Sequence, residues 1–361
     1  MSEIFEINSS IKNYTVCLAE NGAISLIKDY SELVIIDQKV NKLWPSLNID
    51  TPIQVEAVEN NKTLATVGAI IESLREKGAT RNSTVLAIGG GIIQDVSTFC
   101  ASSYMRGVNW IYVPTTLLGM VDSCIGGKSS INVGKYKNIA GNFYPPKQIL
   151  VDVAFCQTLS EQQLVEGLCE SVKICYAHSR ECFDKYLTNL ELSKPLHDID
   201  FENIVSLSLK TKKEFIEKDE FDQNIRLLLN FGHTFGHALE GASEFAISHG
   251  IAVGLGMISA YKLSIDLGMI EAKNPRVLEL LNHVTQLLTK VDGLYRVLNS
   301  INMSDAVEKF KSDKKHEKNN YVAILYDREG CLVRHKFERN KKSEKLIVES
   351  FNYLRNYKDE I

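Results

Sequence analysis

Strand-like runs alternate with a helical pattern over the first 150 residues, and this alternation restricts the fold more than any other feature. The runs at 33–36 (LVII), 85–88 (VLAI) and 110–113 (WIYV) are short and apolar, as expected of strands buried on both faces. Between the first two, residues 64–77 have helical periodicity that ends at Gly78, a helix-stop signal. This order predicts a Rossmann-like parallel sheet with helices on both faces.

The second half of the chain has a different pattern. Long amphipathic stretches at 161–177, 201–218 and 250–267 dominate it, and strand signals are few until 321–326. A length of 361 residues is also too great for one ordinary core. We therefore predict an NAD-binding α/β domain at 1–158 and a mainly α-helical metal- and substrate-binding domain at 159–361. The motifs described below are the basis for assigning NAD, metal and substrate to these domains.

Composition excludes several classes of partner. A formal net charge of −4 argues against a nucleic-acid or membrane-surface partner, although local Lys and Arg can still form an anion pocket. The first residues, MSEIFEINSS, lack the apolar core of a signal peptide, and no run approaches a membrane span. The eight cysteines form no C-x-x-C pair, which favours reduced, buried thiols. We expect a cytoplasmic protein.

Three glycines follow the second strand-like run. Gly89, Gly90 and Gly91 precede a helix that we expect to begin near Asp95. Such a turn lets backbone N–H groups and a helix N-terminus approach a pyrophosphate closely. The pattern is not G-x-G-x-x-G, however, and an ordinary tight βα turn is an equal alternative for it alone.

Polar residues gather after the next strand-like run. Ligands bind at the carboxyl ends of parallel strands, and hydroxyls, a carboxylate, lysines and an amide there suit a nucleotide and a phosphate. Each residue alone is typical of solvated surface, but their density around glycine corners favours a binding site. The residues concerned are Thr115, Thr116, Asp122, Lys128, Lys137 and Asn138.

Histidines form the strongest local signal. His233 and His237 are four residues apart and would share a helical face, and His249 follows shortly after. No Glu follows His233, which excludes the metalloprotease pattern H-E-x-x-H. Two of these histidines with a carboxylate such as Glu170 would supply the three protein ligands of a catalytic zinc site. Core or surface histidines remain the alternative.

Further charged groups lie nearby in sequence. Glu170 and Lys173 are spaced to share a helical face, where a surface ion pair is the simpler interpretation. Lys212, Arg226 and the 313–315 segment (DKK) add positive charge that would otherwise be a solvated charge run.

Taken in order, these residues resemble the dehydroquinate synthase family of sugar phosphate cyclases. The resemblance runs from about Glu59 to Lys315. Its motifs are GGGIIQD, RGVNWIYVPTTLLGMVDSCIGGKSSIN, KNIAGNFYPP, EGLCESVK, RLLLNFGHTFGHALE and HGIAVGLGM.

The resemblance implies a role for each matching position. The metal, Zn²⁺ or Co²⁺, would be held by Glu170, His233 and His249. NAD would contact Glu59, Lys62, Gly90, Gly91, Asp95, Thr115, Thr116, Lys128 and Lys137. The catalytic residues would be Lys173, His237, Asn230, Lys128 and Asp122, and the substrate-binding residues Arg106, Lys137, Asn138, Lys212, Arg226 and Lys314. Arg106 would reach the neighbouring subunit's active site, which implies a homodimer.

The resemblance also implies a reaction. A hydride would leave a phosphorylated sugar acid for NAD and later return, so that phosphate is eliminated and a carbocycle closes. Because Lys212, Arg226 and His237 match the dehydroquinate synthase pattern, we expect conversion of 3-deoxy-arabino-heptulosonate 7-phosphate to 3-dehydroquinate, a lyase step of the shikimate pathway leading to aromatic amino acids.

Three departures from the family pattern leave alternatives open. The usual HPLGKN is VGKYKN here, the glycine two before Arg226 is Asn224, and an AEVIK-like segment is CESVK. A specialised cyclase acting on another phosphorylated sugar is therefore an alternative. A metal-dependent alcohol dehydrogenase would share the glycine turn and the histidine ligands. It would not need the group that jointly holds two anions, which consists of Lys128, Lys137, Asn138, Lys212 and Arg226. A non-catalytic binding paralogue should have lost a metal or proton-relay residue, and none is lost.

Overall fold

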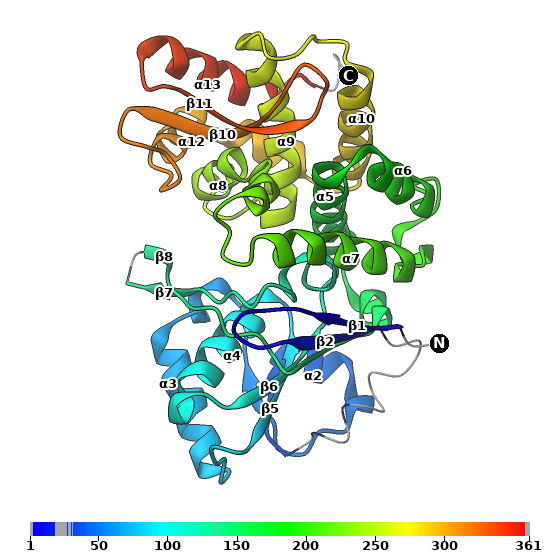
Figure 1. Cartoon of the computed structure of the whole chain (residues 1–361), viewed down its shortest axis with the longest axis vertical. Helices are drawn as coiled ribbons and strands as arrows, with labels where there is room; N and C mark the ends of the chain where they lie inside the picture. The colour runs from blue at the N-terminus through cyan, green and yellow to red at the C-terminus, as the bar shows by residue number, and fades with distance from the viewer. Residues whose placement is uncertain (1–2, 19–26, 28–29, 31, 135, 358–361) are drawn as a thin grey trace. The chain divides into compact units, whose positions relative to one another are not determined.

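The computed structural model describes residues 3–18, 27, 30, 32–134 and 136–357 (Figure 1). It divides the chain into two compact units, which we call unit 1 (Met1–Leu159 with Asp200–Glu220) and unit 2 (Ser160–Ile199 with Phe221–Ile361). The chain first passes from unit 1 to unit 2 after Leu159, and the NAD-binding and metal-binding roles of the two expected domains stay predictions. The segment Asp200–Glu220 differs, because we expected it in the second domain and it belongs to unit 1.

Unit 1 is built on a seven-stranded sheet in the order β1-β2-β9-β6-β5-β3-β4. Only β1 and β2 pair antiparallel, and the other neighbours are parallel. The predicted Rossmann-like sheet is thereby confirmed. The strands are β1 (Glu3–Ile7), β2 (Tyr14–Leu18), β3 (Val34–Asp37), β4 (Ile53–Val55), β5 (Thr84–Gly89), β6 (Asn109–Pro114) and β9 (Gln148–Val151).

The central strands are apolar because both their faces are covered. Nearly every residue of β3, β5 and β6 is buried, whereas β1 at the edge alternates between exposed and covered positions. Helix α4 packs on β5 and β6, and α3 packs on α4 (Figure 1). The helices of unit 1 are α2 (Gln38–Leu43), α3 (Leu64–Glu76), α4 (Gly91–Ser103) and α7 (Glu202–Lys218), and a small hairpin is formed by β7 (Ile131–Val133) and β8 (Tyr136–Ala140).

Helix ends in unit 1 follow their local chemistry. The Thr63 side chain caps α3 by accepting from the Thr66 N–H, and Gly78 takes a left-handed conformation (φ +78°) after its last turn. Helix α4 begins earlier than expected, at Gly91 with Gly90 as its N-cap, so that Asp95 lies in its second turn. The reason is that the strand ends at Gly89, and the backbone turns directly into the helix.

Unit 2 is mainly helical, as predicted. Its helices are α5 (Glu161–His178), α6 (Arg180–Asn189), α8 (His233–Ala242), α9 (His249–Asp266), α10 (Pro275–Thr289), α11 (Leu294–Ser300), α12 (Met303–Lys311) and α13 (Lys341–Tyr353), and its hairpin joins β10 (Asn320–Tyr326) to β11 (Leu332–Glu338). No described helix is long and apolar enough to cross a membrane.

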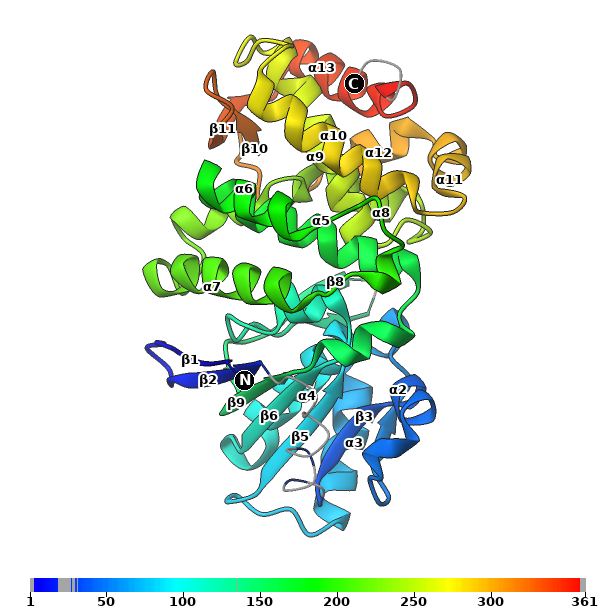
Figure 2. The same ribbon diagram turned by 90° about the vertical axis from the view of Figure 1, so that its right-hand side faces the viewer.

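Helix α9 is the centre of unit 2. Its residues are buried nearly all around, because α5, α8, α10, α13 and β10 surround it. Figure 2 shows α5 and α6 beside α10 on one side of this unit. The charged C-terminal helix α13 is amphipathic as expected, and it buries Ile347 and Phe351.

Glycines bring the helices of unit 2 close together. A Cβ atom on Gly256 would lie 2.0 Å from the carbonyl oxygen of Gly232, and one on Gly236 would lie 3.0 Å from the backbone of Ala252. A Cβ atom on Gly250 would lie 2.4 Å from the carbonyl oxygen of Glu166. Helices α8 and α5 therefore approach α9 at backbone distance, which only glycine permits at these positions.

Candidate functional site

The sequence-predicted residues fall into two groups, one in each unit. Glu59, Lys62, Asp95, Asp122, Lys128, Lys137, Asn138 and Lys212 belong to unit 1, together with Arg106 and the glycine and threonine residues. Glu170, Lys173, Arg226, Asn230, His233, His237, His249 and Lys314 belong to unit 2. We describe the geometry of each group separately.

A charged network in unit 1 joins the second turn of α4 to the β7–β8 hairpin. The Lys62 ammonium lies 3.0 Å from an Asp95 carboxylate oxygen and 3.8 Å from Glu59, and Lys137 lies 3.8 Å from Glu59. Burial raises the pKa of Asp95, and the charge of Lys62 opposes that shift. The backbone N–H of Ser130 donates to the other Asp95 oxygen at 2.8 Å. Four predicted residues are thus brought into one network, with Glu59 and Asp95 beside the buried Lys62.

Two residues of this network were missed by the sequence analysis. The Asn132 amide donates to a Glu59 carboxylate oxygen at 2.8 Å, and the Ser130 hydroxyl donates to the Asn138 side chain at 2.9 Å. Asn132 also accepts from the Asn138 N–H at 2.9 Å, which helps to hold Asn138 in a left-handed conformation (φ +52°). Their alternate spacing in the SSIN motif was a usable signal, since residues two apart in a strand share a face.

The glycine turn closes tightly on the threonine pair. A Cβ atom on Gly90 would lie 2.9 Å from Thr116 Cγ2, so that any larger residue would force the Thr116 side chain to move. The Thr115 N–H donates to the Gly89 carbonyl at 3.1 Å, which ties the carboxyl ends of β5 and β6 together. No side chain caps the first turn of α4. Its N–H groups can therefore receive an anion, as a pyrophosphate site requires.

Lys212 meets Asp122 in unit 1. The Lys212 ammonium lies 2.8 Å from Asp122 Oδ1 and donates to the backbone carbonyls of Asp122 and Ile125. Asp122 lies in a π-helical turn, Gly119–Ser123, a distortion that is frequent at functional sites. Lys212 and Arg226 were both predicted to bind the substrate, and Arg226 is buried in unit 2 in the short helix η8 (Ile225–Asn230). Their joint action stays a prediction.

Arg106 and Lys128 are exposed on unit 1. Arg106 follows Met105 in a left-handed conformation (φ +66°), at the end of a short turn before β6. The backbone of Lys128 forms an isolated antiparallel β-bridge with that of Phe143. Their predicted contacts with a ligand or a second subunit stay predictions.

The histidines of unit 2 lie around one carboxylate. His233 and His237 share a face of α8, as predicted, and their ring centroids are 5.3 Å apart. Glu170 Oε1 lies 3.7 Å from His233 Nε2 and 3.3 Å from His249 Nε2. The other carboxylate oxygen, Oε2, accepts from the Lys173 ammonium. Glu170 and Lys173 are therefore a buried pair and not the surface pair that their spacing alone suggested.

This arrangement fits a divalent metal. Glu170 Oε1 is fully buried and accepts no hydrogen bond of good geometry among the described residues. Ligand atoms sharing a tetrahedral zinc lie about 3.3–3.5 Å apart, given metal–ligand bonds of about 2.0–2.2 Å. The 3.3 Å distance from Glu170 to His249 lies in that range, and the 3.7 Å distance to His233 lies slightly above it. One carboxylate and two imidazoles are also a ligand set that zinc uses in enzymes.

Charge is strongly coupled in this cluster. Burial alone would raise the pKa of Glu170, but Lys173 and His249 lower it to about 2. Burial alone would lower the pKa of His249, but the adjacent carboxylates of Glu170 and Glu240 raise it to about 10. The site thus holds His249 as a cation when no metal is present. A metal would take the place of that proton.

The third histidine has different neighbours. The three histidines can place one ring nitrogen each within 4.8 Å of one another, so His237 is close to the same point. Although His237 is exposed, desolvation by the groups around its ring and the nearby Lys315 charge lower its pKa to about 4. The Lys315 ammonium lies 3.4 Å from His237 Nδ1 and 3.1 Å from Asp313. His237 is therefore a neutral imidazole beside a cation.

Two side chains of this cluster were not among the predicted site residues. Glu240 contacts His249 Nδ1 at 3.2 Å, and its position three residues after His237 on α8 was a usable signal. Lys315, with Asp313, lies against His237, whereas the predicted Lys314 is exposed. Which of the two neighbouring lysines turns inward depends on the fold of the turn. Asn230, at the end of η8, donates to the Leu227 carbonyl at 3.2 Å.

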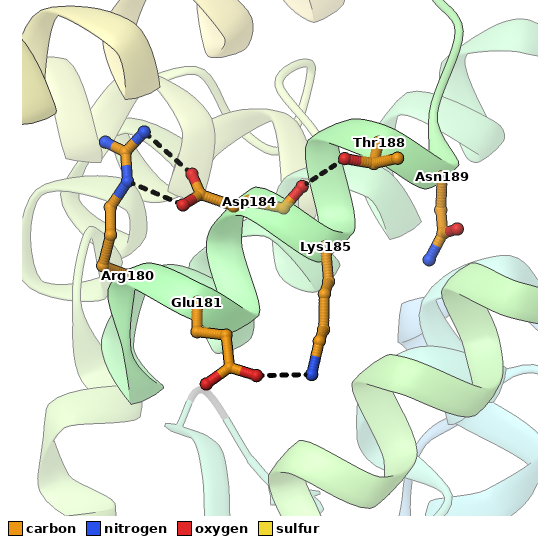
Figure 3. Close-up of a pocket in the computed structure, with 6 residues that line it drawn as sticks. All are labelled: Arg180, Glu181, Asp184, Lys185, Thr188 and Asn189. Atoms are coloured by element: carbon orange, nitrogen blue, oxygen red, sulfur yellow. Dashed lines mark hydrogen bonds and ion pairs between the residues drawn. The ribbon is translucent and has the colours of Figure 1, made fainter.

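A surface hollow elsewhere on unit 2 contains none of these residues. Its lining comes from one exposed helix, α6, and Figure 3 shows its charged side chains paired with one another. Arg180 lies 2.8 Å from Asp184, and Lys185 lies 2.7 Å from Glu181. We assign it no role.

Family models and curated relatives that match this sequence carry the same description. A family model described as 3-dehydroquinate synthase N-terminal matches residues 52–166, and one described as 3-dehydroquinate synthase C-terminal matches residues 167–316. A 3-dehydroquinate synthase of Saccharolobus solfataricus is 37% identical over 309 residues, covering 82% of this chain and 84% of the relative. One of Endomicrobium trichonymphae is 35% identical over 345 residues, covering 91% of this chain and 93% of the relative.

Solved structures show the same fold. A 2-deoxy-scyllo-inosose synthase, complexed with carbaglucose-6-phosphate, NAD⁺ and Co²⁺, has a TM-score of 0.81 at 22% identity and covers 97% of this chain and 99% of its own. A 2-epi-5-epi-valiolone synthase from Streptomyces hygroscopicus, with NAD⁺ and Zn²⁺ bound, has a TM-score of 0.81 at 24% identity, with the same coverage. The matches to both family models and to the curated relatives show that the chain belongs to the 3-dehydroquinate synthase family.

Proposed function

We propose that this protein is a metal- and NAD-dependent lyase that converts 3-deoxy-arabino-heptulosonate 7-phosphate to 3-dehydroquinate and phosphate in the shikimate pathway. Family membership supports the reaction. The observation that carries the proposal is the buried Glu170 carboxylate, which turns one oxygen to two histidines and the other to Lys173. Buried charged and polar groups of this kind stabilise a protein no better than apolar side chains packed in the same space. Their presence therefore points to a function.

The metal, Zn²⁺ or Co²⁺, would be held by Glu170, His233 and His249. When bound, it would polarise a substrate hydroxyl, and NAD would accept and return a hydride. Both ions and NAD⁺ occur in the related cyclase structures named above. Lys173 would keep the Glu170 carboxylate ionised and oriented, because its ammonium is fully buried beside that group.

NAD would lie against the glycine turn and the charged network of unit 1. Gly90, Gly91, Thr115 and Thr116 would face the pyrophosphate, because the first turn of α4 has no side-chain cap and Gly90 permits close approach. The contacts proposed for the rest of the cofactor are Glu59, Lys62, Asp95, Lys128 and Lys137.

Proton transfer would use the groups beside the metal ligands. Because His237 is a neutral imidazole, a free ring nitrogen could take up a proton from a substrate hydroxyl. The Lys315 ammonium would stabilise developing negative charge there. Asn230, Lys128, Asp122 and Lys173 are the further catalytic residues that we propose.

The substrate anions would be held by fixed positive charge. Lys137, Asn138, Lys212, Arg226 and Lys314 would contact the substrate, and Arg106 would reach the phosphate in a second subunit's site, so that the active protein is a homodimer. We also propose that it acts in the cytoplasm, where a reduced pool keeps its buried cysteines as free thiols.

The direct test is phosphate release from the heptulosonate phosphate with NAD⁺ and Zn²⁺ present. We expect phosphate to appear over many turnovers while NADH does not accumulate, because the hydride returns within each cycle. Omitting NAD⁺ or chelating the metal should stop the reaction. NADH that builds up in proportion to product would contradict the proposal and indicate an alcohol dehydrogenase.

Arg226→Lys separates the two cyclase proposals. This variant keeps the charge but loses the planar fork that binds a carboxylate with two hydrogen bonds. We expect kcat/KM on the acid to fall about tenfold to a hundredfold, equivalent to about 1–3 kcal/mol, with metal content unchanged. The variant and wild type should both be assayed on a neutral sedoheptulose phosphate. A wild type that prefers the neutral sugar would replace the proposed substrate with that of a specialised cyclase.

A further inference from the structure

Both histidines proposed as metal ligands have an acceptor behind the ring. His233 Nδ1 lies 3.1 Å from the carbonyl oxygen of Phe231, and His249 Nδ1 lies 3.2 Å from Glu240 Oε2. A carbonyl or carboxylate oxygen can only accept, so when a metal ion lies beside Glu170 and both rings are neutral, the N–H of each ring belongs on Nδ1. The lone pair of each ring then lies on Nε2, the atom that approaches Glu170 Oε1.

The two acceptors differ in kind. For His233 the acceptor is backbone, two residues earlier on the same chain segment. For His249 it is a side chain from another helix, since Glu240 is on α8 and His249 is the first residue of α9. The His249 side chain is 36% exposed, against 13% for His233 and 15% for Glu240. The more exposed ring is therefore the one that depends on a removable partner for its orientation.

We propose that Glu240 is the positioning residue of the metal ligand His249. Its carboxylate accepts the Nδ1–H, fixes the tautomer, aims Nε2 at the point beside Glu170, and adds negative charge behind the ring. Partners of this kind orient metal-bound imidazoles and raise their basicity, and their loss costs about 10–100-fold in metal affinity. The inference rests on the metal site of the proposed function.

The test measures Zn²⁺ affinity of the full-length, metal-free protein by competition with a chromophoric chelator. We expect Glu240→Ala to weaken binding about 10–100-fold, because the ring loses its acceptor and the charge. Glu240→Gln should lose less, about tenfold at most, because its amide oxygen still accepts from Nδ1–H. Glu244→Gln, an exposed carboxylate just after the end of α8, is the matched control and should bind as wild type does.

Two further measurements separate positioning from a structural role. The visible absorption of bound Co²⁺ reports ligand geometry, and it should change in Glu240→Ala and stay close to wild type in Glu240→Gln. Glu240→Ala combined with His249→Ala should bind no more weakly than His249→Ala alone, because one interaction is being removed twice. Additive losses, or a lowered melting temperature of metal-free Glu240→Ala with unchanged Zn²⁺ affinity, would overturn the inference.

The outcome also distinguishes this inference from the proposed function. If His249→Ala binds Zn²⁺ as tightly as wild type, the metal site itself is wrong. If His249→Ala loses the metal and both Glu240 variants keep wild-type affinity, the metal site stands and the role of Glu240 is refuted.

Discussion

Gly250→Ala tests whether close helix packing sets the spacing of the metal site. Gly250 follows His249 on α9, and Glu166 precedes Glu170 by one turn of α5. A Cβ atom at 250 would lie 2.4 Å from the carbonyl oxygen of Glu166 and 2.5 Å from its Cα atom. Because these are backbone atoms, a rotamer change cannot relieve the contact. The helices must separate by about 1 Å to restore ordinary van der Waals distances.

The cost follows from two opposing effects. Alanine is favoured over glycine inside a helix by about 1 kcal/mol. Overpacking a tight contact lowers the free energy of unfolding by about 1–3 kcal/mol. We expect a loss near the upper limit here, because the added Cβ atom meets backbone atoms of Glu166. We expect unfolding in urea to show a net loss of about 2 kcal/mol. The 3.3 Å separation of Glu170 Oε1 and His249 Nε2 should widen too, so that Zn²⁺ affinity falls at least about tenfold.

Gly241→Ala is the matched control in the same unit. Gly241 is also helical, but a Cβ atom there would meet only the flexible side chain of Lys309, 3.2 Å away at Cδ. We expect this variant to keep wild-type metal affinity and to gain up to about 1 kcal/mol in stability. If Gly250→Ala is as stable as Gly241→Ala, or binds Zn²⁺ as wild type does, the packing argument is refuted.

Three further predictions concern buried charge, metal and pH. Lys173→Met should destabilise the metal-free protein in urea by about 3–5 kcal/mol, because the buried Glu170 carboxylate loses its cation; a loss below about 1 kcal/mol would contradict this. Chelating the metal should lower the melting temperature by roughly 5–10 °C if metal was present at a hundred times its Kd, whereas identical melting curves would speak against the site. Burial lowers the pKa of His283 to about 4 from 6.5. The unfolded state therefore takes up this proton first as the pH falls, so that stability is fully present above about pH 6.5 and decreases by up to about 3 kcal/mol toward pH 4. His283→Gln should flatten that part of the stability curve, and an unchanged slope would refute the assignment.

The sequence alone was sufficient for features that depend on neighbouring residues. The buried runs of β5 and β6, the helix ending at Gly78 and the shared face of His233 and His237 were all predicted correctly. Each is encoded in a short stretch, because strand and helix periodicity report which faces a segment buries. The family motifs added the two-part fold and the residues to examine.

The tertiary structure alone decided features that join distant parts of the chain. Helix α7 follows the first helices of unit 2 in sequence but belongs to unit 1, and its amphipathic pattern cannot show which core its apolar face covers. Lys315 contacts His237 from 78 residues away, and which of two adjacent lysines does so depends on the turn that carries them. The Glu170–Lys173 spacing suggested a surface pair, but both side chains are buried, and His233 of α8 and His249 of α9 lie beside Glu170. Periodicity shows that a face is covered, whereas packing alone determines what covers it.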